Sequence, residues 1–123
     1  MSTTFTFPRS RRLTQRQEYL ACYRRGKKYH SRNFILFVLP ANKPGRGFRL
    51  GIAASKKVGG AVTRNRIKRL VREYFRLKQG SLDPDLDIAV VAKKGVRVED
   101  LDYWLVKQDL DQALERICRK TQT

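Results

Sequence analysis

Basic side chains are concentrated in one short stretch of the sequence, residues 55–76. Its basic residues, together with one asparagine among them, are Lys56, Lys57, Arg64, Asn65, Arg66, Lys68, Arg69, Arg72 and Arg76. Arginine presents a planar fork of N–H donors that matches a phosphate group, and it also stacks on nucleobases. The asparagine adds a neutral donor and acceptor. These residue types favour contacts with a phosphate-rich partner.

The spacing of these residues predicts one helix over residues 62–78 with two different faces. The apolar residues fall on one stripe and predict the core face: Ile67, Leu70, Val71, Tyr74 and Phe75. Asn65, Lys68, Arg69, Arg72 and Arg76 fall on the opposite side, with Arg64 beside the core face and Arg66 toward the far edge. A merely solvated face usually mixes signs. Here Glu73 is the single acid of the segment, so a binding surface is favoured.

The charge of the whole chain also favours a phosphate-rich partner. Its 123 residues include 28 Lys and Arg against 11 Asp and Glu, a formal net charge of +17. The excess is confined to residues 1–82, which hold 21 of the basic residues and only two acids, Glu18 and Glu73. Solubility needs a net charge of only about 2–8 on a small domain. A polyanion partner is therefore favoured over a solubilising surface.

Other chemistry finds little support in the sequence. Cys22, Cys118 and His30 do not have the spacing of zinc ligands. Two buried thiols are favoured over a disulfide, because a reducing compartment is expected. Asp83, Asp85 and Asp87 alternate in the manner of a cation site, but they surround a proline, and a solvated turn is favoured. We therefore expect neither a catalytic residue nor a metal ligand from this chain.

The location of the protein is predicted from two further features. The longest apolar run, residues 34–39, is far shorter than the roughly 20 residues that span a bilayer. Residues 1–12 lack the apolar centre and cleavage site of a secretory signal. No membrane association and a cytoplasmic location are expected.

The elements that must position the basic helix can be read from periodicity and turn residues. A flexible basic arm over residues 1–12 precedes a single domain over 13–120. The expected elements are a helix at 14–25, strands at 33–39 and 48–55, the basic helix at 62–78, a strand at 87–92 and a helix at 99–119, with room for a short strand near 28–30. Thr14 and Gln17 fit a capping box at the first helix, and Glu99, Asp100 and Asp102 fall in the first turn of the last. The order predicts an α+β fold with helices on a small mixed sheet.

The segment 55–73 resembles a known signature. It reads Ser-Lys-Lys-Val-Gly, then Ala-Val-Thr-Arg-Asn-Arg-Ile-Lys-Arg-Leu-Val-Arg-Glu after one further glycine. This run is similar to the signature of the bacterial ribonuclease P protein subunit. Tyr19, Tyr23, Gly26, the apolar run 34–39 and the segment 87–94 fit the flanking pattern, so the resemblance extends over residues 12–118.

The resemblance implies an accessory subunit of a ribonucleoprotein endonuclease. Its partners would be the catalytic RNA, one protein per RNA, and precursor tRNA, from which the RNA removes the 5′ leader. The Mg²⁺ ions would be held chiefly by the RNA. The implied fold is the ribosomal S5 domain 2-like type, with a left-handed β-α-β crossover. The sequence pattern alone would favour a right-handed one.

The resemblance also assigns roles to residues. Contacts with the catalytic RNA fall on Arg64, Asn65, Arg66, Lys68, Arg69 and Arg72, with Lys56 and Lys57 extending the same surface. Contacts with the leader fall on Tyr19, Tyr23 and Phe37, with Arg11, Arg12 and Arg32 as further candidates. The family usually has phenylalanine at the two helix positions and often tyrosine at the strand position, so the types are exchanged here. From spacing alone, Tyr19 and Tyr23 share one helix face, and core packing would be favoured.

Two other classes of function stay open at this point. A ribosomal protein of related fold would share the charge without needing the whole 55–73 signature. A stand-alone protein nuclease would need a carboxylate or histidine constellation, which the sequence does not offer. Processing of precursor tRNA with added catalytic RNA would separate these classes.

Overall fold

The computed structural model describes residues 12–41, 47–78, 85–94 and 101–121. The elements in chain order are α1 (Arg16–Arg25), β1 (Lys27–His30), β2 (Phe34–Pro40), β3 (Arg49–Ala53), α2 (Ala61–Lys78), β4 (Leu86–Ala92) and α3 (Tyr103–Thr121). They confirm the α+β class and every expected helix and strand, including the short strand before β2. The expected arm at residues 1–11 lies outside the described residues.

The four strands form one mixed sheet in the order β1-β2-β4-β3. β2 pairs antiparallel with both β1 and β4, while β3 pairs parallel with β4, so that Arg49 lies opposite Asp87. β4 is therefore an interior strand. Its residues Ile88, Ala89 and Val90 are buried, as the continuous apolar run predicts for a strand covered on both faces.

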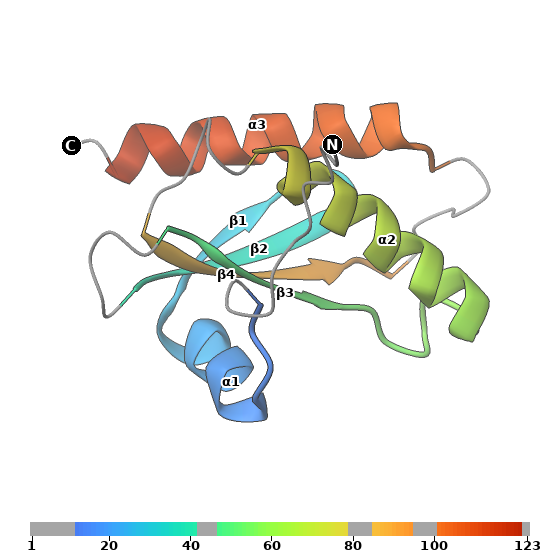
Figure 1. Cartoon of the computed structure of the whole chain (residues 1–123), viewed down its shortest axis with the longest axis horizontal. Helices are drawn as coiled ribbons and strands as arrows, with labels where there is room; N and C mark the ends of the chain where they lie inside the picture. Colours follow the sequence, from blue (N-terminus) through green and yellow to red (C-terminus); the bar gives the residue numbers. More distant parts are fainter. Residues whose placement is uncertain (1–11, 42–46, 79–84, 95–100, 122–123) are drawn as a thin grey trace, which may run out of the picture.

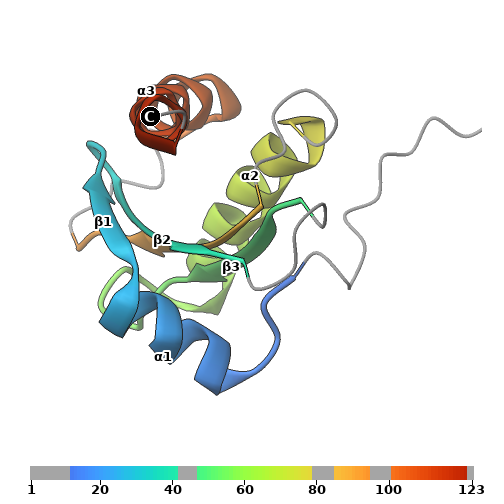
Figure 2. The same cartoon turned by 90° about the vertical axis from the view of Figure 1, so that its left-hand side faces the viewer.

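Helix α2 makes the crossover between the parallel strands β3 and β4. Figures 1 and 2 show α2 above the sheet and β3 at its near edge, with β3 running toward the end at which α2 begins. Viewed from the α2 side with the strands pointing up, β4 lies to the left of β3. The crossover is thus left-handed, as the resemblance implies and against the usual right-handed rule.

The two faces of the sheet are covered differently. Helices α2 and α3 lie over one face and α1 lies alone under the other (Figures 1 and 2). On the two-helix face, Phe34, Leu36 and Val38 of β2 pack with Ile67 and Leu110 in the main core. On the α1 face, the described residues that are buried together are Leu13, Cys22 and Ala89, with Tyr19, Phe37 and Leu39 partly buried against them. Cys22 is a free buried thiol, as expected; the side chain of Cys118 lies outside the described part.

The beginnings of two helices differ from the prediction. Helix α1 begins at Arg16, and its capping residues are Gln15 and Glu18, not Thr14 and Gln17. Glu18 Oε1 accepts hydrogen bonds from the amides of Thr14 (2.9 Å) and Gln15 (3.0 Å). A carboxylate can accept both bonds at once, and this carboxylate also has a cationic partner, described below.

Helix α3 begins later than predicted. Asp102 stands before its first turn and accepts a hydrogen bond from the amide of Leu105 (2.9 Å), which is the geometry of an N-cap. The expected acidic first turn was therefore wrong for Asp102, because the residue caps the helix from outside. Glu99 and Asp100 lie outside the described residues.

Candidate nucleic-acid interface

The outer face of α2 carries most of the predicted RNA-contacting residues. Four of the five predicted core residues of the helix are buried, Ile67, Val71, Tyr74 and Phe75, and the fifth, Leu70, is partly buried against the same core. Asn65, Arg66, Arg69 and Arg72 are exposed, and Arg64 and Lys68 are partly buried. Lys56 and Lys57 are exposed in the turn before the helix. The apolar side of α2 is thus fixed in the core, and the opposite side presents its cations to solvent.

The cations of α2 do not form one uniform ridge. Arg76 pairs with Glu73, so its charge is already compensated. Arg66 Nη2 donates to the carbonyl of Leu101 (3.2 Å), which turns this side chain toward the start of α3. Arg72 lies on the opposite flank, close enough for its charge to act on the Tyr19 hydroxyl. The surface therefore has an α3 flank and an α1 flank.

Arg64 has an unusual environment. Its Nε atom is buried without a hydrogen-bond partner within the described structure, although the side chain as a whole is partly exposed. A buried N–H without an acceptor costs about 1–3 kcal/mol. An acceptor from outside the chain would reach this donor only if the Arg64 side chain turned outward.

Three aromatic rings meet between α1 and the sheet. The ring centroids of Tyr23 and Phe37 are 4.9 Å apart in an edge-to-face arrangement, and those of Tyr19 and Tyr23 are 6.4 Å apart. Lys28 Nζ stands 5.5 Å from the Phe37 centroid. Tyr23 is 36% exposed, whereas Tyr19 and Phe37 are partly buried. The structure thus brings the three predicted aromatics together in a half-open cluster beside a cation.

Tyr19 is held in place by strand β3. The backbone of Ile52 hydrogen-bonds to its hydroxyl group. A Cβ atom on Gly51 would lie 2.6 Å from the Tyr19 ring, so glycine lets the ring rest directly on the strand. Burial raises the pKa of Tyr19, while the Ile52 bond and the Arg72 charge oppose the rise. The hydroxyl is therefore neutral at physiological pH.

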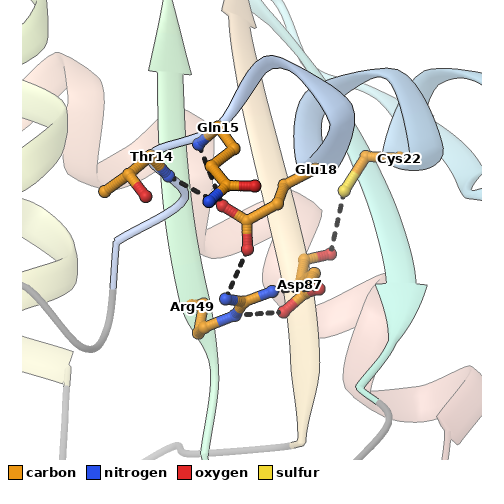
Figure 3. A network of polar contacts seen from close by, with 6 residues as sticks. All are labelled: Thr14, Gln15, Glu18, Cys22, Arg49 and Asp87. Carbon is orange, nitrogen blue, oxygen red and sulfur yellow. Dashed lines mark hydrogen bonds and ion pairs between the residues drawn. The ribbon is translucent and has the colours of Figure 1, made fainter.

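An ion network that the sequence prediction missed fixes α1 to the sheet (Figure 3). Arg49 of β3 donates to both Asp87 oxygens (2.9 Å each) and, through Nη1, to Glu18 Oε2 (2.6 Å). Cys22 Sγ lies 3.9 Å from the Asp87 carbonyl oxygen. The available signal was Glu18 itself, one of only two acids in the basic first 82 residues.

Desolvation and hydrogen bonding act in opposite directions within this network. Burial raises the pKa of Glu18, but bonds from the Gln15 and Thr14 amides and from Arg49 outweigh it, and the pKa is lowered. Burial raises the pKa of the Cys22 thiol to about 11. The carboxylate is thus charged and the thiol neutral at physiological pH, which suits an anchoring role.

The remaining candidate leader contacts, Arg11, Arg12 and Arg32, do not form one group in the described structure. Arg12 is exposed and lies beside Leu50 of β3, on the strand that also holds Tyr19. Arg32 is exposed, but its amide donates to Asp109 of α3 (2.8 Å), so it belongs to the side covered by α3 rather than to the aromatic cluster. Arg11 lies outside the described residues.

The described aspartates at the start of β4, Asp85 just before the strand and Asp87 within it, have protein partners. Asp85 accepts from the Gly47 amide (2.7 Å) and Asp87 binds Arg49, while Asp83 lies outside the described part. Within residues 12–41, 47–78, 85–94 and 101–117, no three His, Cys, Asp or Glu side chains gather as a metal site would require. None of the described helices is sufficiently long and apolar to span a bilayer.

The fold and surface define a class: a small α+β protein with a left-handed crossover helix that carries exposed cations beside an aromatic cluster. The family model described as Ribonuclease P matches residues 7–118. The ribonuclease P protein component of Desulfovibrio desulfuricans is 46% identical over 94% of this chain and 88% of its own. The chain belongs to the ribonuclease P protein family, and its role is that of the protein subunit.

Solved structures agree with this assignment. The ribonuclease P protein of Staphylococcus aureus has a TM-score of 0.75 at 31% identity, covering 87% of this chain and 94% of that one. The protein from Thermotoga maritima has a TM-score of 0.76 at 32% identity, covering 85% and 96%. The fold predicted by resemblance is therefore confirmed.

Proposed function

We propose that the chain binds the catalytic RNA of ribonuclease P through α2 and the 5′ leader of precursor tRNA through the aromatic cluster of Tyr19, Tyr23 and Phe37. One observation carries this proposal: the Tyr19 ring rests on Gly51 of β3, the edge strand whose chain continues into α2. The cationic helix and the aromatic cluster are therefore neighbours around the β3 edge. A strand of RNA leaving a duplex held at α2 would reach the aromatic rings directly.

The two parts of this surface suit two kinds of RNA contact. Exposed arginines bind phosphates of structured RNA, since their planar donors match phosphate oxygens. Tyr23 and Phe37 offer ring surface on which unpaired bases stack, with Lys28 beside them for the backbone charge. The exchange of tyrosine and phenylalanine relative to the family pattern preserves stacking.

In this proposal the protein assists and the RNA performs the endonucleolytic removal of the leader. The Mg²⁺ ions are held chiefly by the RNA, and one protein binds one RNA in the cytoplasm. The Asp85 and Asp87 carboxylates are engaged by Gly47 and Arg49, which supports a structural use for them. The protein lowers the Mg²⁺ requirement because its cations neutralise phosphates where RNA strands meet.

Reconstitution tests the proposal. A bacterial ribonuclease P RNA is given precursor tRNA at low Mg²⁺, with and without the protein. Faster cleavage at the mature 5′ end with protein is expected, and equal cleavage would refute the proposal. Arg69→Ala should weaken binding to the catalytic RNA about five- to tenfold and lower the salt dependence by about one phosphate contact. Lys107→Ala on α3, a control of equal charge, should change binding less than twofold.

The leader contact has a separate readout. Tyr23→Ala should remove most of the affinity difference between precursor tRNA and leaderless tRNA in the holoenzyme, about tenfold per stacked base. Tyr23→Phe should keep the difference, since the ring remains. An unchanged difference in Tyr23→Ala would refute the leader assignment while leaving the α2 assignment intact.

A further inference from the structure

An exposed indole stands on the α3 flank of the cationic helix. Trp104, in the first turn of α3, is 67% exposed and is the single tryptophan of the chain. Tryptophan is mostly buried in folded proteins because of its large apolar area. Neither the family signature nor the aromatic cluster under the sheet includes this residue.

The helix turn that carries Trp104 is firmly anchored, so the exposed indole ring forms a rigid platform. Asp102 caps the helix at Leu105, and Val106 and Leu110 are fully buried, so the first turn is anchored to the core. The neighbouring ring of Tyr103 is partly buried against the same core, with its centroid 6.3 Å from that of Trp104. The indole is therefore exposed on a rigid element.

One exposed cation lies next to this platform. Arg66 of α2 donates to the Leu101 carbonyl, just before the helix. Arg76 and Lys107 lie near the Tyr103 hydroxyl, but each is already paired with an acid, Arg76 with Glu73 and Lys107 with Asp111. Figure 1 shows the first turns of α2 and α3 at the same end of the molecule. The platform thus adjoins the helix proposed to bind RNA.

We propose that Trp104 stacks on an unpaired base of the catalytic RNA, on the α3 flank and apart from the leader cluster. This proposal rests on the proposed function, since it assumes that α2 binds that RNA. A protein partner is less well matched, because Arg66, an exposed cation, reaches the start of α3 beside the ring. An exposed ring beside an exposed arginine fits a base beside its phosphate.

The single tryptophan makes the test direct. The protein is titrated with ribonuclease P RNA without tRNA, following indole emission and, independently, binding by gel shift. We expect strong quenching of the emission that saturates together with binding. Trp104→Ala should weaken RNA binding about tenfold and Trp104→Phe less than about threefold, because a ring is retained. Leu105→Ala, a neighbouring exposed control, should bind as the wild type does.

The contrary outcomes are distinct. Gel-shift binding without a change in emission, or wild-type affinity of Trp104→Ala, would overturn the stacking proposal and leave the proposed function standing. Emission that depends on protein concentration without RNA would assign the indole to self-association and also overturn it. Absence of gel-shift binding by the wild type would overturn both. Matched thermal unfolding of the variants confirms that an affinity change is not a loss of fold.

Discussion

The two faces of the sheet are stabilised by different means. Under α2 and α3, large apolar side chains such as Phe34, Leu36 and Leu110 fill a continuous core. Under α1 the buried apolar cluster is small, and the ion network of Arg49, Glu18 and Asp87 holds the helix instead. The first face gains its stability from burial. The second leaves its aromatic rings half open, as the proposed leader contact requires.

The largest expected effect sharpens this comparison within one strand. Leu36 is fully buried in the main core, whereas Leu39, three residues later, is only partly buried under α1. Leu36→Ala should reduce the free energy of unfolding by about 2–5 kcal/mol, and Leu39→Ala by about 1 kcal/mol. Urea denaturation of both variants measures the difference. Equal losses would show that the α1 face is packed as tightly as the other.

The second-largest loss of stability is expected when the ion network of Arg49, Glu18 and Asp87 is broken. Arg49→Ala leaves two largely buried carboxylates without their cation and should cost about 2 kcal/mol. Arg49→Lys keeps the charge but loses the two-pronged contact, so about half of that loss is expected. The more exposed pair of Lys107 and Asp111 on the other face provides the control, with less than about 0.5 kcal/mol for Lys107→Ala. A similar cost for both alanine variants would contradict an anchoring role for Arg49.

A smaller effect is expected at the contact between β3 and the aromatic cluster. Gly51→Ala would push its Cβ into the Tyr19 ring and should cost about 1 kcal/mol of stability. It should also displace Tyr19 and reduce the preference for leader-bearing tRNA. In a Tyr19→Ala background the same substitution should cost much less, because the clashing ring is gone. An undiminished cost in that background would place the strain elsewhere.

The smallest effect is a pH dependence. Because the pKa of Glu18 is lowered in the folded chain, its stabilisation is complete above the ordinary glutamate pKa of about 4.3. It is lost as the pH falls through the lowered folded value. Glu18→Gln should remove this component, less than about 1 kcal/mol, from unfolding curves recorded between pH 6 and 3. Identical pH profiles for variant and wild type would exclude Glu18 as a contributor.

Local pattern predicted the elements and the buried side of α2, because the period of the apolar residues is a property of the chain itself. It missed features that depend on distant partners. Glu18 replaced Gln17 in the cap of α1, since its carboxylate is also oriented by Arg49, 31 residues away. The bond from the Arg32 amide to Asp109 of α3 was likewise missed, while the leader contact of the Arg32 side chain stays a prediction. The division of the α2 cations into two flanks depends on Leu101 and Tyr19, which the helical wheel does not contain.

The contacts of β3 with the segment before α1 have a consequence for self-association. β3 forms one edge of the sheet, and edge strands with free N–H and C=O groups recruit further strands and aggregate. Here the Leu13 amide donates to the Leu50 carbonyl (2.9 Å), and the Ile52 backbone is bonded to the Tyr19 hydroxyl. The exposed rim is thus capped by the chain's own residues. Tyr19, which is proposed to bind RNA, therefore also hinders a second copy of the protein from pairing with the free edge of β3.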